Sequence, residues 1–332
     1  FGTTGSADFP VTNSAYQTIF NGGPSFSPSG MGVSFPNGSD IFVSRISING
    51  GSLLTSTFLG GTDNDGLNTA SQLKYNYADE VRGEIDIDRQ NNIYIATCTK
   101  STDFPTTNSF QSLNNGGQEG CIIKMDNQLT SVIWSSYLGG GADDGIYSLA
   151  LDKNDNIYVT GGTTSSDFPI TATAYQTLHQ DSLRADAFIS LLNSEGTQLL
   201  SSSYYGTEQY DQSYFVEIGS NDAVYLFGQT KASATDLVQN ATYFQSGAGQ
   251  FIAVFTEDLD SVLRATVLGT GKGTPDISPT AFLVDVCDKI YLSGWGSNLG
   301  GPLSTLNLPV SANAYQSNTD GNDFYLMVVD DA

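Results

Sequence analysis

Short apolar runs separated by polar turn residues recur along the whole chain of 332 residues. They are rich in β-branched and aromatic residues and are bounded by Gly, Asn, Asp or Pro, which is typical of β-strands. Between residues 146 and 205 there are four such runs, IYSLALD, NIYVTG, DAFISLL and QLLSSSYY. No segment of comparable length has apolar residues at the helical period. The pattern therefore predicts an all-β protein.

The four-strand pattern repeats with a period of about 65 residues. One tyrosine of the second strand marks each repeat, at Tyr94, Tyr158, Tyr225 and Tyr291. Four short strands repeated head to tail are typical of β-propeller blades. We name the strands a to d and expect antiparallel blades with strand a innermost and strand d outermost.

The repeat divides one propeller domain, residues 1–332, into five units. The boundaries are 1–61 (strands c and d only), 62–139, 140–206, 207–269 and 270–332 (strands a, b and c). This gives 17 expected strands, one more than four complete blades. Because a propeller cut open would leave unpaired edges, we expect a part of a larger ring of seven or eight blades.

The loop between strands b and c contains two further repeated motifs, residues 167–169 (DFP) and 174–176 (AYQ) in the third unit. A residue repeated in every blade is better explained by holding the blade than by binding one ligand. We therefore expect Phe168 and Tyr175 to pack on the blade face, Pro169 to fix the backbone and Asp167 to cap the turn.

These motifs together resemble the SBBP repeat of bacterial β-propellers. The third unit has YLGG at 137–140, DDG at 143–145, NIYVTG at 156–161, then DFP, AYQ and DAFI at 186–189. The fourth unit departs from the pattern because its loop lacks DFP. The resemblance implies a propeller of a large exported cell-surface protein of Bacteroidota, a type IX secretion cargo that meets the secretion machinery during export. Its expected location is extracellular or on the outer cell surface.

Composition and charge narrow the possible partners. The net charge of −23 would repel a phosphate backbone and anionic lipid, so we expect no nucleic-acid binding. No apolar run approaches the length needed to span a bilayer, so we expect no membrane insertion. No signal peptide is recognisable at the start of the sequence.

Acidic residues recur where strand d passes into the next strand a, at Asp63, Asp65, Asp143, Asp144, Asp211 and Asp276. Glycoside hydrolysis uses one carboxylate pair with unequal environments, whereas these residues recur blade after blade. We therefore favour a structural role for these acidic residues, in turns or in hydrogen bonds between blades. Asp152, Asn154 and Asn156 are weak calcium candidates, because they lack the glycine and the distant glutamate of an EF-type loop. Otherwise we expect no cofactor, no metal and no catalytic residue.

Two cysteines near one loop suggest a covalent link. Cys98 lies at the end of strand b and Cys121 at the start of strand c, so antiparallel pairing brings these strand ends together. An exported protein could oxidise them to a disulfide. The alternative is two buried thiols that act as small apolar side chains.

Two long insertions, residues 21–39 and 62–82, belong to connections that emerge on the same face of neighbouring blades. They supply aromatic and polar side chains typical of binding surfaces, namely Phe26, Met31, Phe35, Tyr75, Tyr77, Asp79 and Glu80. The alternative is that the insertions pack on each other or on a further blade. The favoured function is a non-catalytic exported binding and scaffold propeller, adhesive or gliding-related, that presents loops to a glycan or protein partner. The alternative is an exported carbohydrate-active enzyme with a carboxylate pair at the channel mouth.

Overall fold

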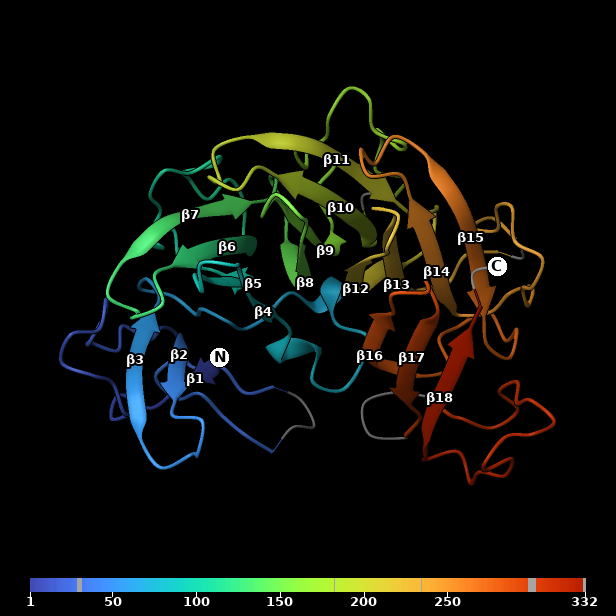
Figure 1. Ribbon diagram of the computed structural model, residues 1–332, viewed down its shortest axis with the longest axis horizontal. Helices are drawn as coiled ribbons and strands as arrows, with labels where there is room; N and C mark the ends of the chain where they lie inside the picture. Colours follow the sequence, from blue (N-terminus) through green and yellow to red (C-terminus); the bar gives the residue numbers. More distant parts are fainter. Residues whose placement is uncertain (29–31, 182, 234, 298–302, 331–332) are drawn as a thin grey trace.

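The computed structural model describes residues 1–28, 32–181, 183–233, 235–297 and 303–330. These residues form 18 strands in five antiparallel sheets, which are arranged as a fan around a common centre (Figure 1). They contain two 3₁₀ turns, η1 (Ser71–Leu73) and η2 (Asp79–Val81), and no α-helix. The predicted all-β fold of propeller-like blades is confirmed.

Three sheets have four strands in the order a-b-c-d. They are β4 (Glu84–Ile87), β5 (Ile93–Thr99), β6 (Glu119–Met125) and β7 (Val132–Leu138); β8 (Asp144–Leu151), β9 (Ile157–Thr163), β10 (Asp186–Leu192) and β11 (Leu199–Tyr205); and β12 (Asp211–Ile218), β13 (Val224–Thr230), β14 (Gln250–Phe255) and β15 (Val262–Leu268). The a strands β4, β8 and β12 lie near the centre of the fan, and the d strands lie at its rim (Figure 1).

The two remaining sheets have three strands each. The first blade contains β1 (Gly2–Thr4), β2 (Asp40–Ile46) and β3 (Leu53–Leu59), and the fifth contains β16 (Ser278–Val284), β17 (Ile290–Trp295) and β18 (Phe324–Val329). The sequence predicted only strands c and d in the first blade. The structure adds β1 as a short strand b, with Thr3 opposite Ile41. Three residues are too few to show a strand pattern, and only the pairing with β2 reveals this strand.

Blades pack face to face, and both faces of the middle strands are buried. Ile93 and Ile95 of β5 pack on Ile41 and Val43 of the first blade. Their neighbour Tyr94 points to the opposite face and packs toward the third blade with Ile146. This explains why strands b and c read as continuous apolar runs: alternate residues meet different blades.

The DFP motif packs on its own blade. The Phe168 ring lies 4.4 Å from the Phe188 ring and 6.2 Å from the Tyr204 ring. The Tyr204 hydroxyl donates to Ser165 O at 2.8 Å and accepts from Phe168 N at 3.2 Å. Tyr137 of the second blade makes the same two bonds to Ser101 O and Phe104 N. The predicted packing role of Phe168 is confirmed.

The AYQ motif holds the end of the b–c loop against strand d of the same blade. We call this segment, residues 174–176 in the third blade, the strap. Gln176 Oε1 accepts Gly206 N at 3.0 Å, its backbone N donates to Ser203 Oγ at 2.9 Å, and its Nε2 donates to Leu178 O at 3.0 Å. Gln17 and Gln111 make the same three kinds of bond in the first two blades. Tyr175 differs from expectation because it is 42% exposed: its ring contacts Tyr205 and Phe255, and its hydroxyl donates to Gln239 Oε1 at 3.3 Å. Asp167 caps the loop before strand a, not its own turn, by accepting Gly141 N at 2.8 Å.

Candidate functional site at the centre of the propeller

The insertion at residues 62–82 runs into the centre of the fan, where η1 and η2 lie between the inner strands (Figure 1). Its side chains bond to residues of the fourth and fifth blades, more than 130 positions away in the chain. The insertion therefore connects blades across the centre, in addition to facing the neighbouring loop as the sequence suggested.

Asp79 anchors this central segment. The side chain is fully buried, and its Oδ2 accepts hydrogen bonds from Tyr75 N at 2.8 Å, Asn76 N at 2.7 Å and the Tyr214 hydroxyl at 3.0 Å. Its Oδ1 accepts Arg82 Nε at 3.1 Å. A buried carboxylate is tolerated when it is paired and hydrogen-bonded in this way. Asp79 is thus a structural residue of the centre.

Arg82 and Asn76 extend the network to other blades. The Arg82 guanidinium lies 4.7 Å from the Tyr214 ring centre and donates to Pro279 O at 3.1 Å. The Asn76 and Gln229 amides exchange two hydrogen bonds of 3.0 and 2.9 Å. These contacts join the second blade to the fourth and fifth, so they fix the shape of the surface above them.

A cavity of about 560 Å³ lies beside this network, between η2, β4 and β16. Five aromatic residues line it: Tyr77, Tyr147, Tyr214, Phe215 and Trp295. The Tyr77 and Trp295 rings meet edge to face at 5.9 Å. The polar lining includes the hydroxyls of Ser278 and Thr280, the Arg82 guanidinium and Glu84. A concave surface that combines aromatic rings with a few polar groups is typical of a small-ligand site.

One carboxylate of the cavity lining, Glu84, has a second buried carboxylate, Glu217, within charge interaction. Glu84 on β4 accepts bonds from Ser148 Oγ and Leu149 N, and burial raises its pKa. Burial, followed by the charges of Glu84 and Asp86, raises the pKa of Glu217 on β12 to about 7. Strands β8 and β16 have Ala150 and Leu283 at the place of Glu217, since all three pair with the repeated tyrosine of strand b. Strand β4 has Asp86 there, opposite Tyr94, so this position is acidic in the second and fourth blades only.

The carboxylates that do repeat lie at the blade junctions. Asp144 Oδ2 accepts Gly140 N at 2.7 Å and Ser165 Oγ at 2.8 Å. Glu119 Oε1 accepts Asn115 N at 2.7 Å and Gly116 N at 3.1 Å. A Cβ atom on Gly139 would lie 2.0 Å from Glu119 Oε2 and 2.6 Å from Asp144 Oδ2, so the two carboxylates share the space above this glycine. They cap backbone amides, as the sequence analysis favoured.

The same acid pair occurs at three junctions. The pairs are Asp40 with Asp65, Glu119 with Asp144, and Asp186 with Asp211. At the fourth junction Gly249 takes the place of the first acid, and Asp276 has a cation instead, Lys272 Nζ at 3.1 Å. Burial is the largest cause that raises the pKa of Glu119 and Asp186 to about 8, and the second acid of each pair raises it further.

The seven residues of the predicted binding patch do not form one surface in the structure. Phe26 and Phe35 form a bridge within the loop at 21–39, and Lys74 Nζ lies 5.3 Å from the Phe26 ring centre and 3.7 Å from Glu80 Oε1. The two insertions therefore do meet. Met31 lies outside the described residues.

The other four residues of the patch have separate places. Tyr75 stacks on Tyr210 at 5.1 Å, Tyr77 lines the central cavity, and Asp79 and Glu80 are buried. Sequence reasoning missed Arg82, Glu84 and Trp295. The sequence did contain one signal for this site: strand b of the fifth blade has Trp295 at the position where the second, third and fourth blades have Cys98, Gly162 and Gln229.

The calcium candidates lie in the a–b turn. Asp152 Oδ1 accepts Asn154 N at 2.6 Å and Asn156 N at 2.8 Å, and its Oδ2 accepts Asn156 Nδ2 at 2.9 Å. Asp88 makes the same three bonds in the second blade. Within the described residues, no group of three or more acidic, His or Cys side chains is placed to hold a metal ion. The only histidine, His179, contacts Thr163 O and the edge of Tyr204.

The predicted disulfide is not formed, because Cys98 and Cys121 are both free and buried. Thr97 stands opposite Cys121, and Cys98 stands opposite Gly120. Since successive residues of a strand point to opposite faces, the two thiols lie on different sides of the sheet. Cys121 packs toward the first blade and Cys98 toward the third. The buried-thiol alternative describes them correctly.

Comparison with known protein families identifies one stretch of the chain. Residues 133–169 match the SBBP beta-propeller repeat. The matched stretch covers β7, β8, β9 and the following DFP motif, and so spans the junction between the second and third blades. No curated protein matches the chain. In the described residues, no helix has the length and apolar character required to cross a membrane.

Proposed function

We propose that this chain is a non-catalytic binding and scaffold propeller whose central cavity and surrounding loops bind a glycan or protein partner. The observation behind the proposal is the aromatic cavity beside Arg82, which is held by a buried network from three blades. A rigid scaffold reduces the ordering cost of binding. The repeated carboxylates accept hydrogen bonds at the blade junctions, and this structural role supports a scaffold function.

A glycan is the partner that this lining fits best. Tyr77 and Trp295 offer apolar ring surface, while Ser278, Thr280 and Glu84 offer hydroxyl and carboxylate groups. Sugar rings present both apolar C–H faces and many hydroxyls, so they match this combination. The loop at 21–39, with Phe26 against Lys74, forms a second aromatic surface on the neighbouring blade.

Glycan binding can be tested on a printed panel of polysaccharides, followed by titration calorimetry with the best binder. Trp295→Ala and Tyr77→Ala should each weaken binding by at least about tenfold, with urea unfolding close to wild type. Tyr243→Ala, which removes a half-exposed tyrosine of the fourth blade, is the matched control. Absence of binding by the wild type, or equal binding by all three variants, would reject the glycan site.

A carbohydrate-active enzyme is the second candidate, because Glu84 of β4 and Glu217 of β12 influence each other and differ in environment. Two carboxylates with different environments can divide the general-acid and base roles, and Glu217 has a pKa of about 7. If this candidate is correct, the wild type releases reducing ends from a soluble polysaccharide and Glu217→Gln does not. No release by the wild type would exclude it.

The location proposed for this chain is the outer cell surface or the extracellular space of a bacterium of the Bacteroidota, after type IX secretion. The SBBP match and the net charge of −23 support this proposal. Protease treatment of intact cells, with an antibody to the chain, tests it. Loss of the antigen from intact cells is expected, and protection until lysis would contradict the proposal.

A further inference from the structure

Three carboxylates gather beside the central cavity. Glu84 lines the cavity, and Asp86 lies on the same face of β4, because alternate residues of a strand point the same way. On β12, Glu217 shares a face with Phe215, which is also part of the lining. The Ser148 hydroxyl joins the two strands, since it donates to Glu84 Oε2 and accepts a backbone N–H of β12 at 3.1 Å. The acids of β4 and β12 therefore come together at this side of the cavity.

These carboxylates are not neutralised by neighbouring cations. Among the described residues, no salt bridge includes Glu84, Asp86 or Glu217. Burial is the largest cause that raises the pKa of each of them, and the charges of Glu84 and Asp86 raise that of Glu217 further. Within the described part of the chain, Glu84 uses Oε2 for both of its hydrogen bonds, from Ser148 and Leu149. Its Oε1 is the atom left to meet a ligand.

Arg82, the cation that lines the cavity, already has its partners. Its Nε donates to Asp79 Oδ1 at 3.1 Å, and one of its terminal nitrogens donates to Pro279 O at 3.1 Å. Asp79 therefore cancels the positive charge, and the lining as a whole presents the negative charge of Glu84. The guanidinium also lies 4.7 Å from the Tyr214 ring centre, so one ring of the lining already binds a cation.

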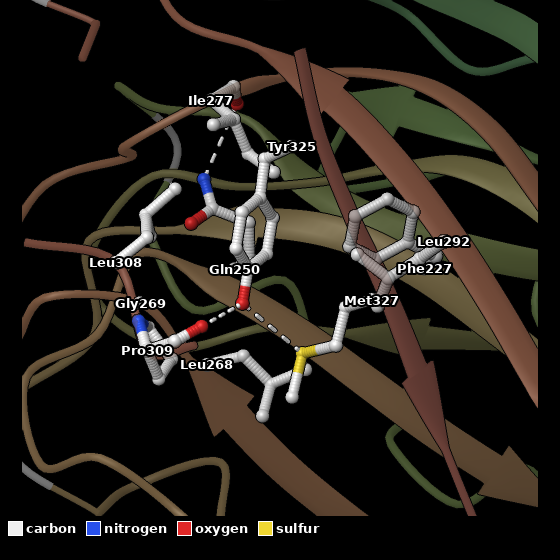
Figure 2. Close-up of a pocket in the computed structure, with 10 residues that line it drawn as sticks. All are labelled: Phe227, Gln250, Leu268, Gly269, Ile277, Leu292, Leu308, Pro309, Tyr325 and Met327. Atoms are coloured by element: carbon white, nitrogen blue, oxygen red, sulfur yellow. Dashed lines mark hydrogen bonds between the residues drawn. The ribbon is translucent and has the colours of Figure 1, made fainter. Parts of the chain in front are cut away.

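The size of the central cavity suits a small sugar. Its volume of about 560 Å³ lies in the range of about 300–1,000 Å³ that is typical of ligand sites. A second cavity, between the fourth and fifth blades, encloses only about 10 Å³, which is the space of about one water molecule. Leu308 and Met327 are among its mainly apolar lining, and the Tyr325 hydroxyl donates to Pro309 O at 2.6 Å within it (Figure 2). A sugar fits the central cavity and not this one.

We propose that the glycan bound in the central cavity carries an amino sugar, whose ammonium group binds Glu84 and whose ring packs on Tyr77 and Trp295. The inference rests on the proposed glycan-binding function and specifies the sugar. An ammonium group donates charge-assisted hydrogen bonds to a carboxylate and is attracted by aromatic ring faces. A neutral sugar gains neither attraction, and a uronic acid would bring a like charge to Glu84. The combination of unneutralised carboxylates and aromatic rings therefore selects a cationic sugar.

The test compares two disaccharides that differ in charge. Chitobiose, the disaccharide of glucosamine, and its neutral counterpart N,N′-diacetylchitobiose are titrated into the whole chain by calorimetry, at a pH at which the amines are protonated. We expect chitobiose to bind at least about tenfold more tightly, because the charge-assisted hydrogen bond and the attraction by the rings act on it alone.

The other outcomes separate this inference from the proposed function. Equal affinities, or tighter binding of the acetylated disaccharide, would overturn the amino-sugar inference and leave the glycan proposal standing. Binding of neither disaccharide would overturn the inference, and the polysaccharide panel then decides whether the glycan proposal also fails. Trilysine has ammonium groups without a sugar ring; if it bound as tightly as chitobiose, charge alone would be recognised and the inference would be wrong.

A variant assigns the preference to one carboxylate. Glu84→Gln removes the charge and keeps an oxygen for Ser148 Oγ and Leu149 N, so the fold should persist by circular dichroism. Its affinity for chitobiose should fall about tenfold, and the advantage of chitobiose over the acetylated disaccharide should disappear. Glu208→Gln, which removes an exposed charge of the fourth blade, is the matched control and should retain the advantage. An unchanged advantage in folded Glu84→Gln would contradict the assignment.

Discussion

Replacing Glu119 with glutamine should make the protein more stable at neutral and alkaline pH. Glu119 is fully buried and faces Asp144 across Gly139, so its negative charge has lost water and gained a like charge. Glutamine keeps an oxygen for Asn115 N and Gly116 N, which Glu119 Oε1 now accepts. Its amide nitrogen can donate toward Asp144. The substitution therefore removes a buried charge and leaves the capping bonds in place.

The size and pH dependence follow from proton linkage. Burial first, and then Asp144, raise the pKa of Glu119 from 4.5 to about 8. Below pH 4.5 the side chain is protonated in both the folded and the unfolded chain, so it imposes no penalty. As the pH rises from 4.5 to 8, the unfolded chain releases the proton more readily, and the free energy of unfolding falls. At 1.36 kcal/mol for each pKa unit, the loss reaches on the order of 5 kcal/mol above pH 8.

Urea unfolding between pH 5 and 8.5 measures this effect. The advantage of Glu119→Gln over the wild type should be small at pH 5, increase through pH 7 and level off above pH 8. Glu208→Gln removes the same charge from an exposed site and is the matched control. An advantage of Glu119→Gln that is independent of pH, or a variant less stable than the wild type at pH 8, would refute the reasoning.

Three further predictions concern the centre, the strands and the thiols. Asp79→Asn should lower the free energy of unfolding in urea by about 3 kcal/mol, because it leaves Arg82 with a neutral partner in a buried site. The control is the exposed Asp258→Asn, and an equal loss of stability in both variants would contradict this reasoning. Gly161→Ala should prevent stable folding, since the new Cβ would lie 1.9 Å from Gly145 O, whereas Gly51→Ala meets only a side chain at 3.3 Å and should fold normally by circular dichroism. Thiol titration without reductant should count one reactive cysteine in the native protein, the exposed Cys287, because Cys98 and Cys121 are buried and burial raises the pKa of Cys98 to about 12. In denaturant it should count three, and a count of one would show a disulfide.

The sequence alone determined the blade pattern, because the information is local and repeated. Ile157, Tyr158 and Val159 are all apolar because the third blade lies between the second and the fourth, so that both faces of its strand b are buried. Such continuous apolar runs make strands b and c recognisable from the sequence. The DFP and AYQ motifs were interpretable as structural for the same reason, as the bonds of Phe168 and Gln176 show. A three-residue strand such as β1 has too little pattern, and its identity depends on β2.

Tertiary structure alone decided the centre of the molecule. The insertion at 62–82 is unique in the chain, so no repeat could show that Asp79 bonds to Tyr214 or that Tyr77 meets Trp295. The faces on which the cysteines lie were also decided by the tertiary structure. Strand order brings Cys98 and Cys121 near each other, but the pairing register places Cys98 one residue away from the partner of Cys121, so the two thiols lie on opposite faces of the sheet. Contacts between distant segments depend on how blades turn around the axis, and a one-dimensional pattern contains periodicity but not that geometry.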